Sequence, residues 1–544
     1  MASQFHVYDT TLRDGAQQEG MNLSVADKLQ IAALADRLGV GFIEGGWPGA
    51  IPKDTEFFAR AAKEISLRQA VLAAFGSTRR AGGQAHNDPQ VRALLDAETP
   101  VVTLVAKSDI RHVERALKTT AAENLAMIED TVEFLVSEGR RVFLDAEHFF
   151  DGYDFDAAYA LDCVKAAAAA GAEVVVLCDT NGGMLPERIH QTVGAVRPGV
   201  PGAELGIHCH NDTGCAVANS LAAVEAGAMH VQGTINGYGE RTGNADLTAI
   251  IPNLVLKSGL AALTPAQLAD LTGVAHAISE VTNIAPFARQ PYVGTSAFAH
   301  KAGLHASAIR VDPDLYQHID PQLVGNDMRM LVSEMAGRAS VELKGKELGF
   351  DLAGQNDLLS RVTEKVKALE ADGYTFDAAD ASFELLLRGE LPGGRPEYFR
   401  VESWRTISET LPNGHGGEPG KLGASSPDAE TASEATVKLW AGSERLVATG
   451  EGNGPVNALD AALRLALGGV YPRLASIDLV DYKVRILDSA RGTDAVTRVM
   501  IESTDGSAVW RTVGVGTNII EASWEALTDA FTFGLMAAGV QPAA

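Results

Sequence analysis

The sequence contains few cysteines and no long apolar segment, and both absences exclude classes of protein. Four cysteines occur among 544 residues, none with the Cys-x-x-Cys spacing: Cys163, Cys178, Cys209 and Cys215. We therefore expect neither a disulfide framework nor a structural zinc ribbon. No apolar run approaches the ~18 residues of a membrane span, and the first residues lack the pattern of an export signal. A cytoplasmic location is expected.

Positive charge is also scarce. Lys and Arg total 45 against 70 Asp and Glu, so the formal net charge is −25. This balance argues against a nucleic-acid-binding surface. Apolar residues make up 46% and charged residues 21%, which is ordinary for a soluble α/β protein and excludes a largely disordered one. The length suits about three or four domains.

Short apolar runs alternate with segments of helical length in the first half of the chain. Apolar strands that alternate with helices favour a parallel sheet covered on both faces, and eight repeats of this unit indicate a closed (β/α)8 TIM barrel. An open doubly wound sheet is the alternative. Ser24 and Gly39 are the expected start and end signals of the first helix. The eight runs are 5–9, 41–45, 70–76, 101–106, 142–146, 173–178, 204–209 and 229–235.

His208 and His210 stand two residues apart at the end of the run 204–209. Because successive strand side chains alternate faces, both imidazoles point to one side and Cys209 points to the other, where we expect it to pack. Two neutral imidazoles at a strand end suit a divalent metal ion. Hydrogen-bonded core or rim histidines are the alternative.

Oxygen ligands for such a metal are available at neighbouring strand ends. Asp14 and Arg13 follow the first run and Asn244 follows the eighth, and these strands are neighbours in a barrel, where chemistry lies at the strand ends. Together with the histidines they form a mixed nitrogen and oxygen set that accepts Mg, Mn, Co or Zn. The set leaves room for a substrate such as a 2-oxo acid, whose ketone and carboxylate oxygens bind the same ion.

The second half of the chain is organised differently. Residues 264–410 predict helical linker subdomains, and residues 411–435, rich in Gly, Pro, Ser and acidic residues, predict a flexible linker. Residues 436–544 contain an internal repeat: TGEGNGP at 449–455 and VGVGTNI at 513–519 each lead from a strand into a helix. We expect an α+β module. Gly-x-Gly favours a structural turn over a phosphate-binding loop, because the third glycine of a dinucleotide fingerprint is missing. The barrel is assigned to residues 1–263.

Three motifs in combination resemble the 2-isopropylmalate, homocitrate and citramalate synthases. They are DTTLRDG at 9–15, HCHND at 208–212 and NGYGERTGN at 236–244. The resemblance covers nearly the whole chain, and it implies that the duplicated C-terminal module is an allosteric regulatory domain. Within the family, EGGWPGAIPKD at 44–54, FGSTRR at 75–80 and CDTNGG at 178–183 are most similar to the citramalate synthase branch.

The resemblance implies a Claisen condensation in which acetyl-CoA attacks a metal-bound 2-oxo acid and thioester hydrolysis releases CoA. For this branch it implies pyruvate as the acceptor, (R)-citramalate as the product and a place in isoleucine biosynthesis. Asp14, His208 and His210 match the metal ligands of the family, and Asn244 matches a more variable fourth ligand.

The same resemblance implies roles for further residues. Arg13 matches the residue that stabilises negative charge on substrate oxygens, for which a guanidinium is suited. Glu147 matches the carboxylate that deprotonates the acetyl methyl group, and Thr180 matches a hydroxyl that binds the acceptor's carboxylate. The alternative for Glu147 is a surface carboxylate. His148, its neighbour, should face away if the strand continues past Glu147.

The segment AFAHKAGLH at 297–305 implies a contribution from a second subunit. Its final residue, His305, matches a histidine that enters the partner's active site, together with a tyrosine for which Tyr316 is the best match. His300 is the rival histidine. These matches imply a homodimer at least, and the C-terminal module implies isoleucine as a feedback effector.

Three alternatives to pyruvate condensation remain open at this point. They are condensation with another 2-oxo acid, a metal-dependent lyase, and a non-catalytic amino-acid sensor that retains the barrel. The intact set of Arg13, Asp14, Glu147, His208 and His210 argues against a sensor, and the duplicated module argues against a simple lyase. A few substitutions can change the acceptor, because one methylene in an apolar pocket changes binding by only about 1–3 kcal/mol.

Overall fold

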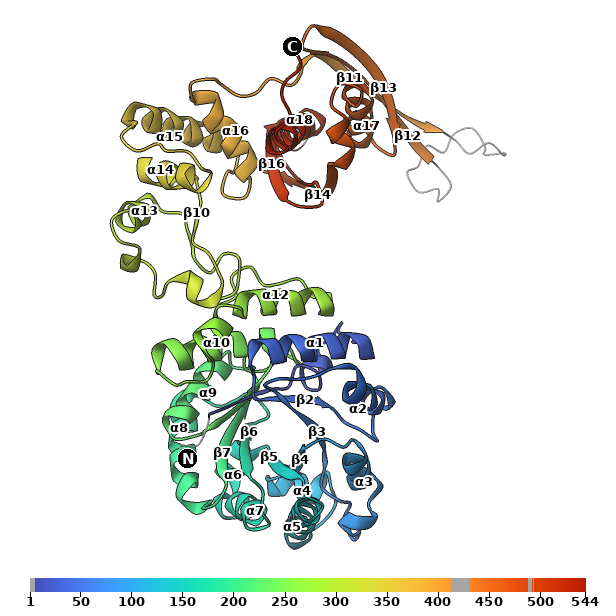
Figure 1. The fold of residues 1–544 in the computed structure, drawn as a ribbon, viewed down its shortest axis with the longest axis vertical. Coiled ribbons are helices and arrows are strands. Elements are labelled where there is room, and N and C mark those ends of the chain that lie inside the picture. The colour runs from blue at the N-terminus through green and yellow to red at the C-terminus, as the bar shows by residue number, and fades with distance from the viewer. Residues whose placement is uncertain (1–4, 412–429, 488–491, 493) are drawn as a thin grey trace. The chain divides into compact units, whose positions relative to one another are not determined.

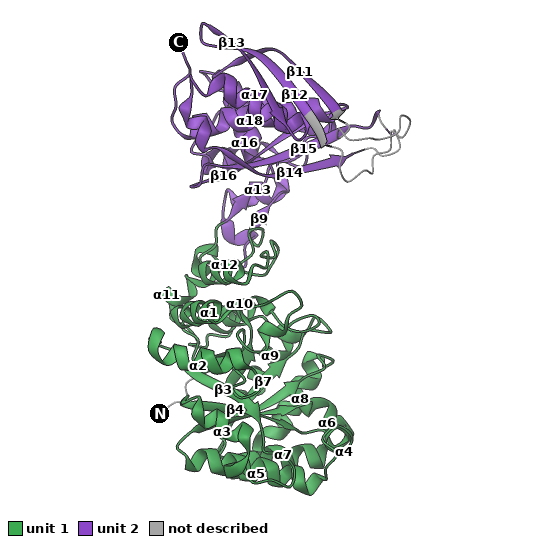
Figure 2. Ribbon diagram, turned by 90° about the vertical axis from the view of Figure 1, so that its right-hand side faces the viewer, with its two compact units in different colours: residues 1–298, 319–327 green, residues 299–318, 328–544 purple. Residues whose placement is uncertain are grey.

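The computed structural model describes residues 5–411, 430–487, 492 and 494–544. The chain forms two compact units, shown as ribbons in Figures 1 and 2. The barrel unit consists of residues 1–298 and 319–327, and the C-terminal unit consists of residues 299–318 and 328–544. Among the described residues, no helix is long and apolar enough to cross a membrane.

The barrel unit contains eight parallel strands that close in chain order, with β1 hydrogen-bonded to both β2 and β8. The predicted TIM barrel is confirmed, and the open sheet is excluded because the first and last strands pair. Each predicted strand is present, and its ends lie within two residues of the predicted ones. The strands are β1 (His6–Asp9), β2 (Phe42–Gly46), β3 (Val71–Ser77), β4 (Val101–Lys107), β5 (Arg141–Glu147), β6 (Val174–Asp179), β7 (Glu204–Cys209) and β8 (His230–Gly233).

Helices follow the strands and cover the outside of the barrel (Figure 1). The first helix begins and ends at the predicted signals. The Ser24 side chain accepts a hydrogen bond from the Asp27 N–H, and Gly39, at φ 98°, supplies a backbone conformation that favours glycine. The helices of this unit are α1 (Val25–Leu38), α2 (Pro52–Glu64), α3 (Pro89–Asp96), α4 (Ile110–Arg115), α5 (Ala121–Ser137), α6 (Phe149–Phe155), α7 (Ala157–Ala169), α8 (Pro186–Val196), α9 (Ala216–Glu225), α10 (Leu247–Pro252), α11 (Pro265–Leu268) and α12 (Leu271–Thr282).

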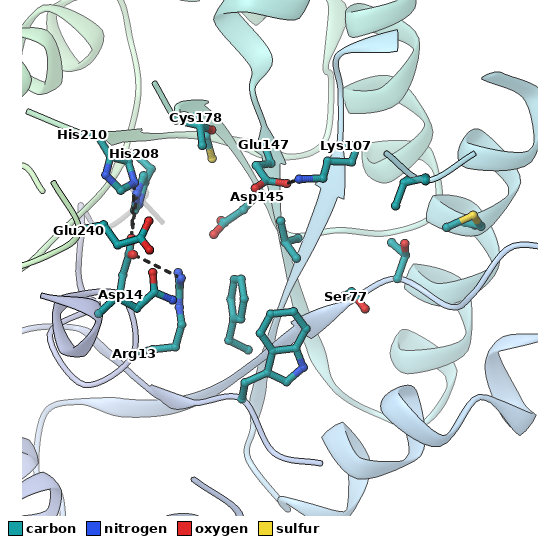
Figure 3. A pocket seen from close by; sticks show the side chains of 18 of the residues that line it. Arg13, Asp14, Ser77, Lys107, Asp145, Glu147, Cys178, His208, His210 and Glu240 are labelled. Atoms are coloured by element: carbon teal, nitrogen blue, oxygen red, sulfur yellow. Dashed lines mark ion pairs between the residues drawn. The ribbon is translucent and has the colours of Figure 1, made fainter. Parts of the chain in front are cut away.

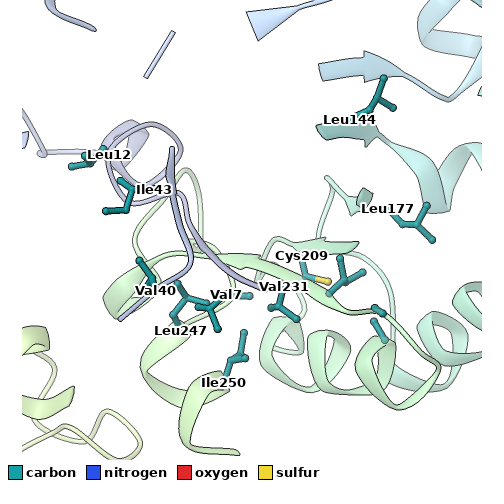
Figure 4. Close-up of a cluster of buried hydrophobic side chains, with 14 of the residues drawn as sticks. Val7, Leu12, Val40, Ile43, Leu144, Leu177, Cys209, Val231, Leu247 and Ile250 are labelled. Carbon is teal, nitrogen blue, oxygen red and sulfur yellow. The ribbon is translucent and has the colours of Figure 1, made fainter. Parts of the chain in front are cut away.

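Alternating strand residues pack on opposite sides of the barrel wall. Val7, Ile43 and Leu177 belong to the large apolar cluster between the strands and the helices, part of which Figure 4 shows. Tyr8 and Phe143 belong to a separate cluster in the barrel interior. The strands are apolar on both faces because both sides of the wall are buried, as expected of a parallel sheet.

His230 is buried in the barrel interior among aromatic rings. The centroid of its fully buried ring lies 5.1 Å from that of Tyr8 and 5.4 Å from that of Phe143. Neither ring nitrogen has a hydrogen-bond partner among the described residues. Burial, together with His6 and His208, lowers the pKa of His230 well below 6.5. The folded barrel therefore keeps this imidazole neutral.

Replacement of His230 by Phe is expected to make the barrel less sensitive to acid. Because the pKa is depressed in the folded state, the unfolded state binds more protons below pH 6.5, and stability falls as the pH falls. From about pH 7.5 to 5.5, this group alone accounts for a loss of roughly 1.4 kcal/mol. Urea unfolding at both pH values measures the difference, with the exposed His190→Phe as the control. An unchanged pH dependence in His230→Phe would contradict this account.

The C-terminal unit begins with helices and two short strands and ends with two similar halves. Each half is a three-stranded antiparallel sheet followed by a helix, so the predicted internal repeat is confirmed. The first half is β11 (Arg400–Leu411), β12 (Glu430–Ala441), β13 (Glu444–Gly452) and α17 (Pro455–Leu467). The second is β14 (Asp478–Ile486), β15 (Thr497–Thr504), β16 (Val509–Gly516) and α18 (Ile519–Ala537). Before them come β9 (Ala299–His300), α13 (Gly303–Ile309), β10 (Arg329–Met330), α14 (Arg338–Glu347), α15 (Asn356–Ala371) and α16 (Asp380–Glu390).

The glycines of the repeat allow each helix to pack closely on its sheet. A Cβ at Gly450 would lie 2.3 Å from the Ala462 nitrogen, and one at Gly514 would lie 2.0 Å from the Ala522 oxygen. Such distances leave no room for a side chain. These distances support the prediction that the Gly-x-Gly pairs have a structural role and do not form a phosphate-binding loop.

The element boundaries differ from the predicted segments at three places. Helix α12 joins the apolar cluster of the barrel unit through Val274 and Ile278, so this unit extends beyond residue 263. Strand β11 lies at the end of the predicted helical region 264–410, and β12 begins inside the predicted linker 411–435. These two strands pair with each other, and that pairing, not local composition, gives them their conformation. Residues 412–429 of the predicted linker lie outside the described residues.

Candidate metal centre and active site

A cavity of about 570 Å³ lies at the carboxyl ends of the barrel strands (Figure 3). It is lined by six of the predicted site residues: Arg13, Asp14, Glu147, Thr180, His208 and His210. They come from the ends of β1, β5, β6 and β7 and from the turns that follow. Closure of the barrel thus brings together residues that lie far apart in the chain.

Asp14, His208 and His210 form the one cluster of described residues with metal-binding geometry. Their ligand atoms all lie within 4.8 Å of one another, and all three residues are buried. The Asp14 Oδ2 atom lies 3.2 Å from His208 Nε2 and 3.8 Å from His210 Nε2. As predicted, Cys209 is buried in the apolar cluster under the helices, away from this group.

Asn244 lies beside this cluster through a β-bridge with His210. Its amide Nδ2 donates to the Tyr238 carbonyl at 3.0 Å, while its buried Oδ1 has no hydrogen-bond partner among the described residues. An unsatisfied buried oxygen costs about 1–3 kcal/mol. Asn244 lines a second cavity, together with Tyr238 and Asp246, and not the cavity that the cluster lines. A carboxylate, two imidazoles and an amide oxygen form a donor set that suits Mg, Mn, Co or Zn.

The charges of the cluster suit a cation. Burial alone would raise the pKa of Asp14, but Arg13 and His208 outweigh it and hold this pKa well below its ordinary value. Burial and the neighbouring His208 lower the pKa of His210 to about 4. Despite its burial, His208 has a raised pKa because it interacts with the Asp14 carboxylate. An ionised carboxylate and a neutral His210 are ready to act as ligands.

Arg13 is held rigidly at the edge of the cavity. Its Nε donates to Glu44 Oε1 at 2.5 Å, and its guanidinium carbon lies 3.8 Å from the centroid of the Phe75 ring. The fully buried Glu44 also accepts a hydrogen bond from the Tyr8 hydroxyl at 2.7 Å. The guanidinium is therefore oriented before a substrate arrives, as electrostatic catalysis requires.

Glu147 and Asp145 point from the same face of β5 into the cavity (Figure 3). Glu147 forms an ion pair with Lys107, which also lines the cavity. Asp145 is buried, and burial, followed by the nearby Glu44 carboxylate, raises its pKa to about 7. Asp145, Lys107 and Glu44 stand at the ends of predicted strands, but the sequence motifs assign them no role. The two-residue spacing from Glu147 was the available signal for Asp145.

Thr180 and His148 meet at the rim of the cavity. The Thr180 hydroxyl oxygen accepts a hydrogen bond from the His148 backbone N–H at 2.8 Å, which leaves its proton available to a ligand. Strand β5 ends at Glu147, and His148 adopts a left-handed conformation with φ 59°. Its ring stacks on His112 with a centroid distance of 3.9 Å. The prediction that His148 faces away from the cavity assumed that the strand continues past Glu147. The strand ends there instead, and the His148 ring packs on His112.

His305 and Tyr316 belong to the C-terminal unit, where they lie together. Their rings stack with a centroid distance of 4.1 Å, and Tyr316 is 40% exposed. The rival residue, His300, has its ring centroid 6.3 Å from that of His305. The two residues that the resemblance places together are therefore neighbours in this unit.

Family models match three consecutive parts of the chain. The HMGL-like model matches residues 4–278, the homocitrate synthase post-HMGL domain-like model matches 292–373, and the LeuA allosteric (dimerisation) domain matches 377–535. Together these matches cover the barrel, the helical segment and the two sheet-and-helix halves.

Several curated proteins are similar over nearly their whole length. An (R)-citramalate synthase of Streptomyces coelicolor is 63% identical over 99% of this chain and 98% of its own. An (R)-citramalate synthase of Aquifex aeolicus is 48% identical, with 98% of each chain covered. A 2-isopropylmalate synthase of Pyrococcus furiosus is 30% identical over 97% of this chain and 99% of its own. The chain belongs to the (R)-citramalate synthase family, within the wider group of HMGL-like barrel proteins.

Proposed function

We propose that this protein is an (R)-citramalate synthase, an acyltransferase that converts the acyl group into an alkyl group on transfer. The methyl carbon of acetyl-CoA forms a bond to C2 of pyruvate, and water then hydrolyses the thioester to release citramalate and CoA. The near-full-length similarity to named (R)-citramalate synthases carries this proposal. The product would enter isoleucine biosynthesis.

We propose roles for the residues that line the cavity. A divalent ion held by Asp14, His208 and His210, with Asn244 as a fourth ligand, would polarise the ketone of pyruvate. The proton of the Thr180 hydroxyl is available to the pyruvate carboxylate, because its oxygen already accepts a bond from the backbone.

Glu147 would transfer the proton, and Arg13 would stabilise the negative charge. Glu147 takes a proton from the acetyl methyl group, which makes that carbon a nucleophile. As the carbon–carbon bond forms, negative charge develops on the former ketone oxygen. This oxygen then takes up a proton from water to become the hydroxyl of citramalate, and Glu147 returns its proton to water. Arg13, fixed by Glu44 and Phe75, offers its remaining N–H groups to that charge.

We further propose that a second subunit completes the site in a homodimer. The stacked pair of His305 and Tyr316 lies in a unit that also contains a match to the LeuA allosteric (dimerisation) domain. Leu304 and Leu315, each next in sequence to a member of the pair, are 75% and 60% exposed and offer apolar surface. This exposure supports coverage by another copy of the chain.

Release of CoA thiol tests the proposed function directly. The purified protein is incubated with acetyl-CoA and a panel of 2-oxo acids, with and without a chelator. We expect pyruvate to have the highest kcat/KM, and we expect the chelator to abolish activity until a divalent ion is restored. Equal or better use of 2-oxoisovalerate would favour a 2-isopropylmalate synthase instead.

We propose isoleucine as a feedback effector of the C-terminal module, residues 436–544. A cavity of about 690 Å³ lies between the start of α17 and β14. Pro455, Val456 and Leu479 offer apolar surface for an aliphatic side chain, and Asp460 and Asp478 offer carboxylates for an ammonium group. The two kinds of lining residue together suit an aliphatic amino acid.

Replacement of Leu479 by Trp is expected to raise the isoleucine concentration for half-inhibition by a factor of 10 or more, roughly the effect of losing 1.4 kcal/mol of binding. The larger ring would fill the cavity. The matched control is Val480→Trp, because Val480 is the next residue of β14 and does not line the cavity. Inhibition assays and gel filtration of both variants provide the measurement. Equal inhibition of both would place the effector elsewhere.

A further inference from the structure

Gln232 connects the metal cluster to the opposite side of the barrel interior. It lies on β8 and is paired in register with His208 of β7, and its side chain is fully buried. Its Oε1 lies 3.0 Å from His208 Nδ1, and its Nε2 donates to Asp145 Oδ1 at 2.9 Å. The result is a buried hydrogen-bonded chain that runs from Asp145 through Gln232 to His208.

We propose that Gln232 is a positioning residue that selects the metal-binding tautomer of His208. This inference rests on the proposed metal site and adds a residue to it. The argument depends on which atoms of the chain donate and which accept.

The direction of the Gln232 amide follows from Asp145. The Asp145 Oδ1 atom accepts, so the NH₂ end of the amide faces it and the carbonyl end faces His208. His208 must then donate from Nδ1. When a cation takes the place of the proton that Nε2 shares with Asp14, His208 is neutral and only one ring nitrogen carries a proton. With that proton held on Nδ1, Nε2 presents its lone pair.

The lone pair of His208 Nε2 lies on the side of the ring that faces the metal cluster. His208 Nε2 is the atom that lies 3.2 Å from Asp14 Oδ2, within the cluster that suits a cation. A reversed amide would donate to Nδ1 and leave the proton on Nε2, where it would point at the cation. Asp145 therefore acts on the metal site through the amide, although it is not one of the clustered ligands.

His210 has no corresponding partner. Its Nδ1 is buried and makes no hydrogen bond to any described residue. Of the two imidazoles, only His208 has its tautomer fixed by a side chain of the described structure. We therefore expect the metal affinity to be sensitive to Gln232.

Replacement of Gln232 by Leu tests the proposal in the full-length protein. Calorimetric titration with MnCl₂ or CoCl₂ should show a dissociation constant 10- to 100-fold higher than in the parent, as is typical when such a partner is lost. The metal concentration for half-maximal activity should rise by the same factor, while kcat at saturating metal changes little. The Co²⁺ absorption spectrum should also shift.

Two variants control for a purely structural effect. In Asp145→Asn combined with Gln232→Glu, the introduced amide donates to the introduced carboxylate, which still accepts from His208, and the total charge is unchanged. This double variant should regain the affinity that Gln232→Leu loses. Asn124→Leu removes another buried amide, which donates to the Lys107 carbonyl at 2.9 Å, and should lower stability without changing metal affinity.

The outcomes separate this proposal from the proposed metal site. If the parent binds neither ion, the metal site itself is wrong. If the parent binds but Gln232→Leu binds equally well, or if the double variant is as weak as Gln232→Leu, only the role of Gln232 is wrong. Should Gln232→Leu fail to fold, Asp145→Leu keeps Gln232 but frees its amide. Parent-like affinity in that variant would overturn the proposal.

Discussion

Replacement of Glu147 by Gln is expected to lower kcat by a factor of about 1,000, within the range of roughly 100 to 10,000 that a positioned general base contributes. Glu147 lines the cavity and is oriented by its ion pair with Lys107. The amide keeps the shape of the side chain but cannot accept the methyl proton. Steady-state assays with acetyl-CoA and with methyl-deuterated acetyl-CoA test this. The isotope effect should be larger in the variant, because proton removal becomes slower than the other steps.

Glu240→Gln is the matched control for this experiment. Glu240 also lines the cavity, but its side chain is 55% exposed and it contacts Arg241 at the rim. Its replacement should leave kcat nearly unchanged. If both variants reduced kcat equally, Glu147 would not be the base, and the buried Asp145, with its pKa raised to about 7, would become the next candidate.

Replacement of Asp14 by Asn should remove high-affinity binding of divalent ions and lower kcat by at least a factor of about 1,000, since about 4 kcal/mol of charge stabilisation is lost. Asp14 is the one carboxylate of the cluster, and its Oδ2 lies 3.2 Å from His208 Nε2. In the parent, MnCl₂ should raise the temperature of unfolding, because the ion binds the folded state. The variant should show no such rise.

Asp212→Asn provides the comparison for Asp14. Asp212 belongs to the same HCHND motif, but its carboxylate forms an ion pair with Arg241 at 2.8 Å and lies outside the metal cluster. MnCl₂ should therefore stabilise Asp212→Asn as it does the parent. A protein lacking Asp14 that MnCl₂ still stabilised to the same extent would show that the ion binds elsewhere.

The metal cluster was predictable because it depends on strand alternation and on the general closure of the barrel. Alternation along a strand places His208 and His210 on one face, and a closed barrel brings the ends of β1 and β7 to the same mouth. Neither argument requires the packing of individual side chains. Asp14 and Asn244 lie in the segments that follow β1 and β8.

Gln232 and Glu44 escaped prediction for the opposite reason. Gln232 lies 87 residues from Asp145, and Glu44 lies 31 residues from Arg13. In the sequence, Gln232 and Glu44 are single polar residues within apolar strands. Its role becomes visible only when barrel closure places a specific partner within hydrogen-bond distance.

The barrel, the repeated passage from strand to helix at 449–455 and 513–519, and the polar residues at the strand ends were all predictable from the sequence. Hydrophobic periodicity and turn residues encode these features locally. Three features are visible only in the folded protein: the contacts between buried polar groups, the packing of α12 on the barrel, and the pairing of β11 with β12. These features depend on contacts between distant segments, whose stability comes from shared burial and hydrogen bonds rather than from the preference of either segment alone.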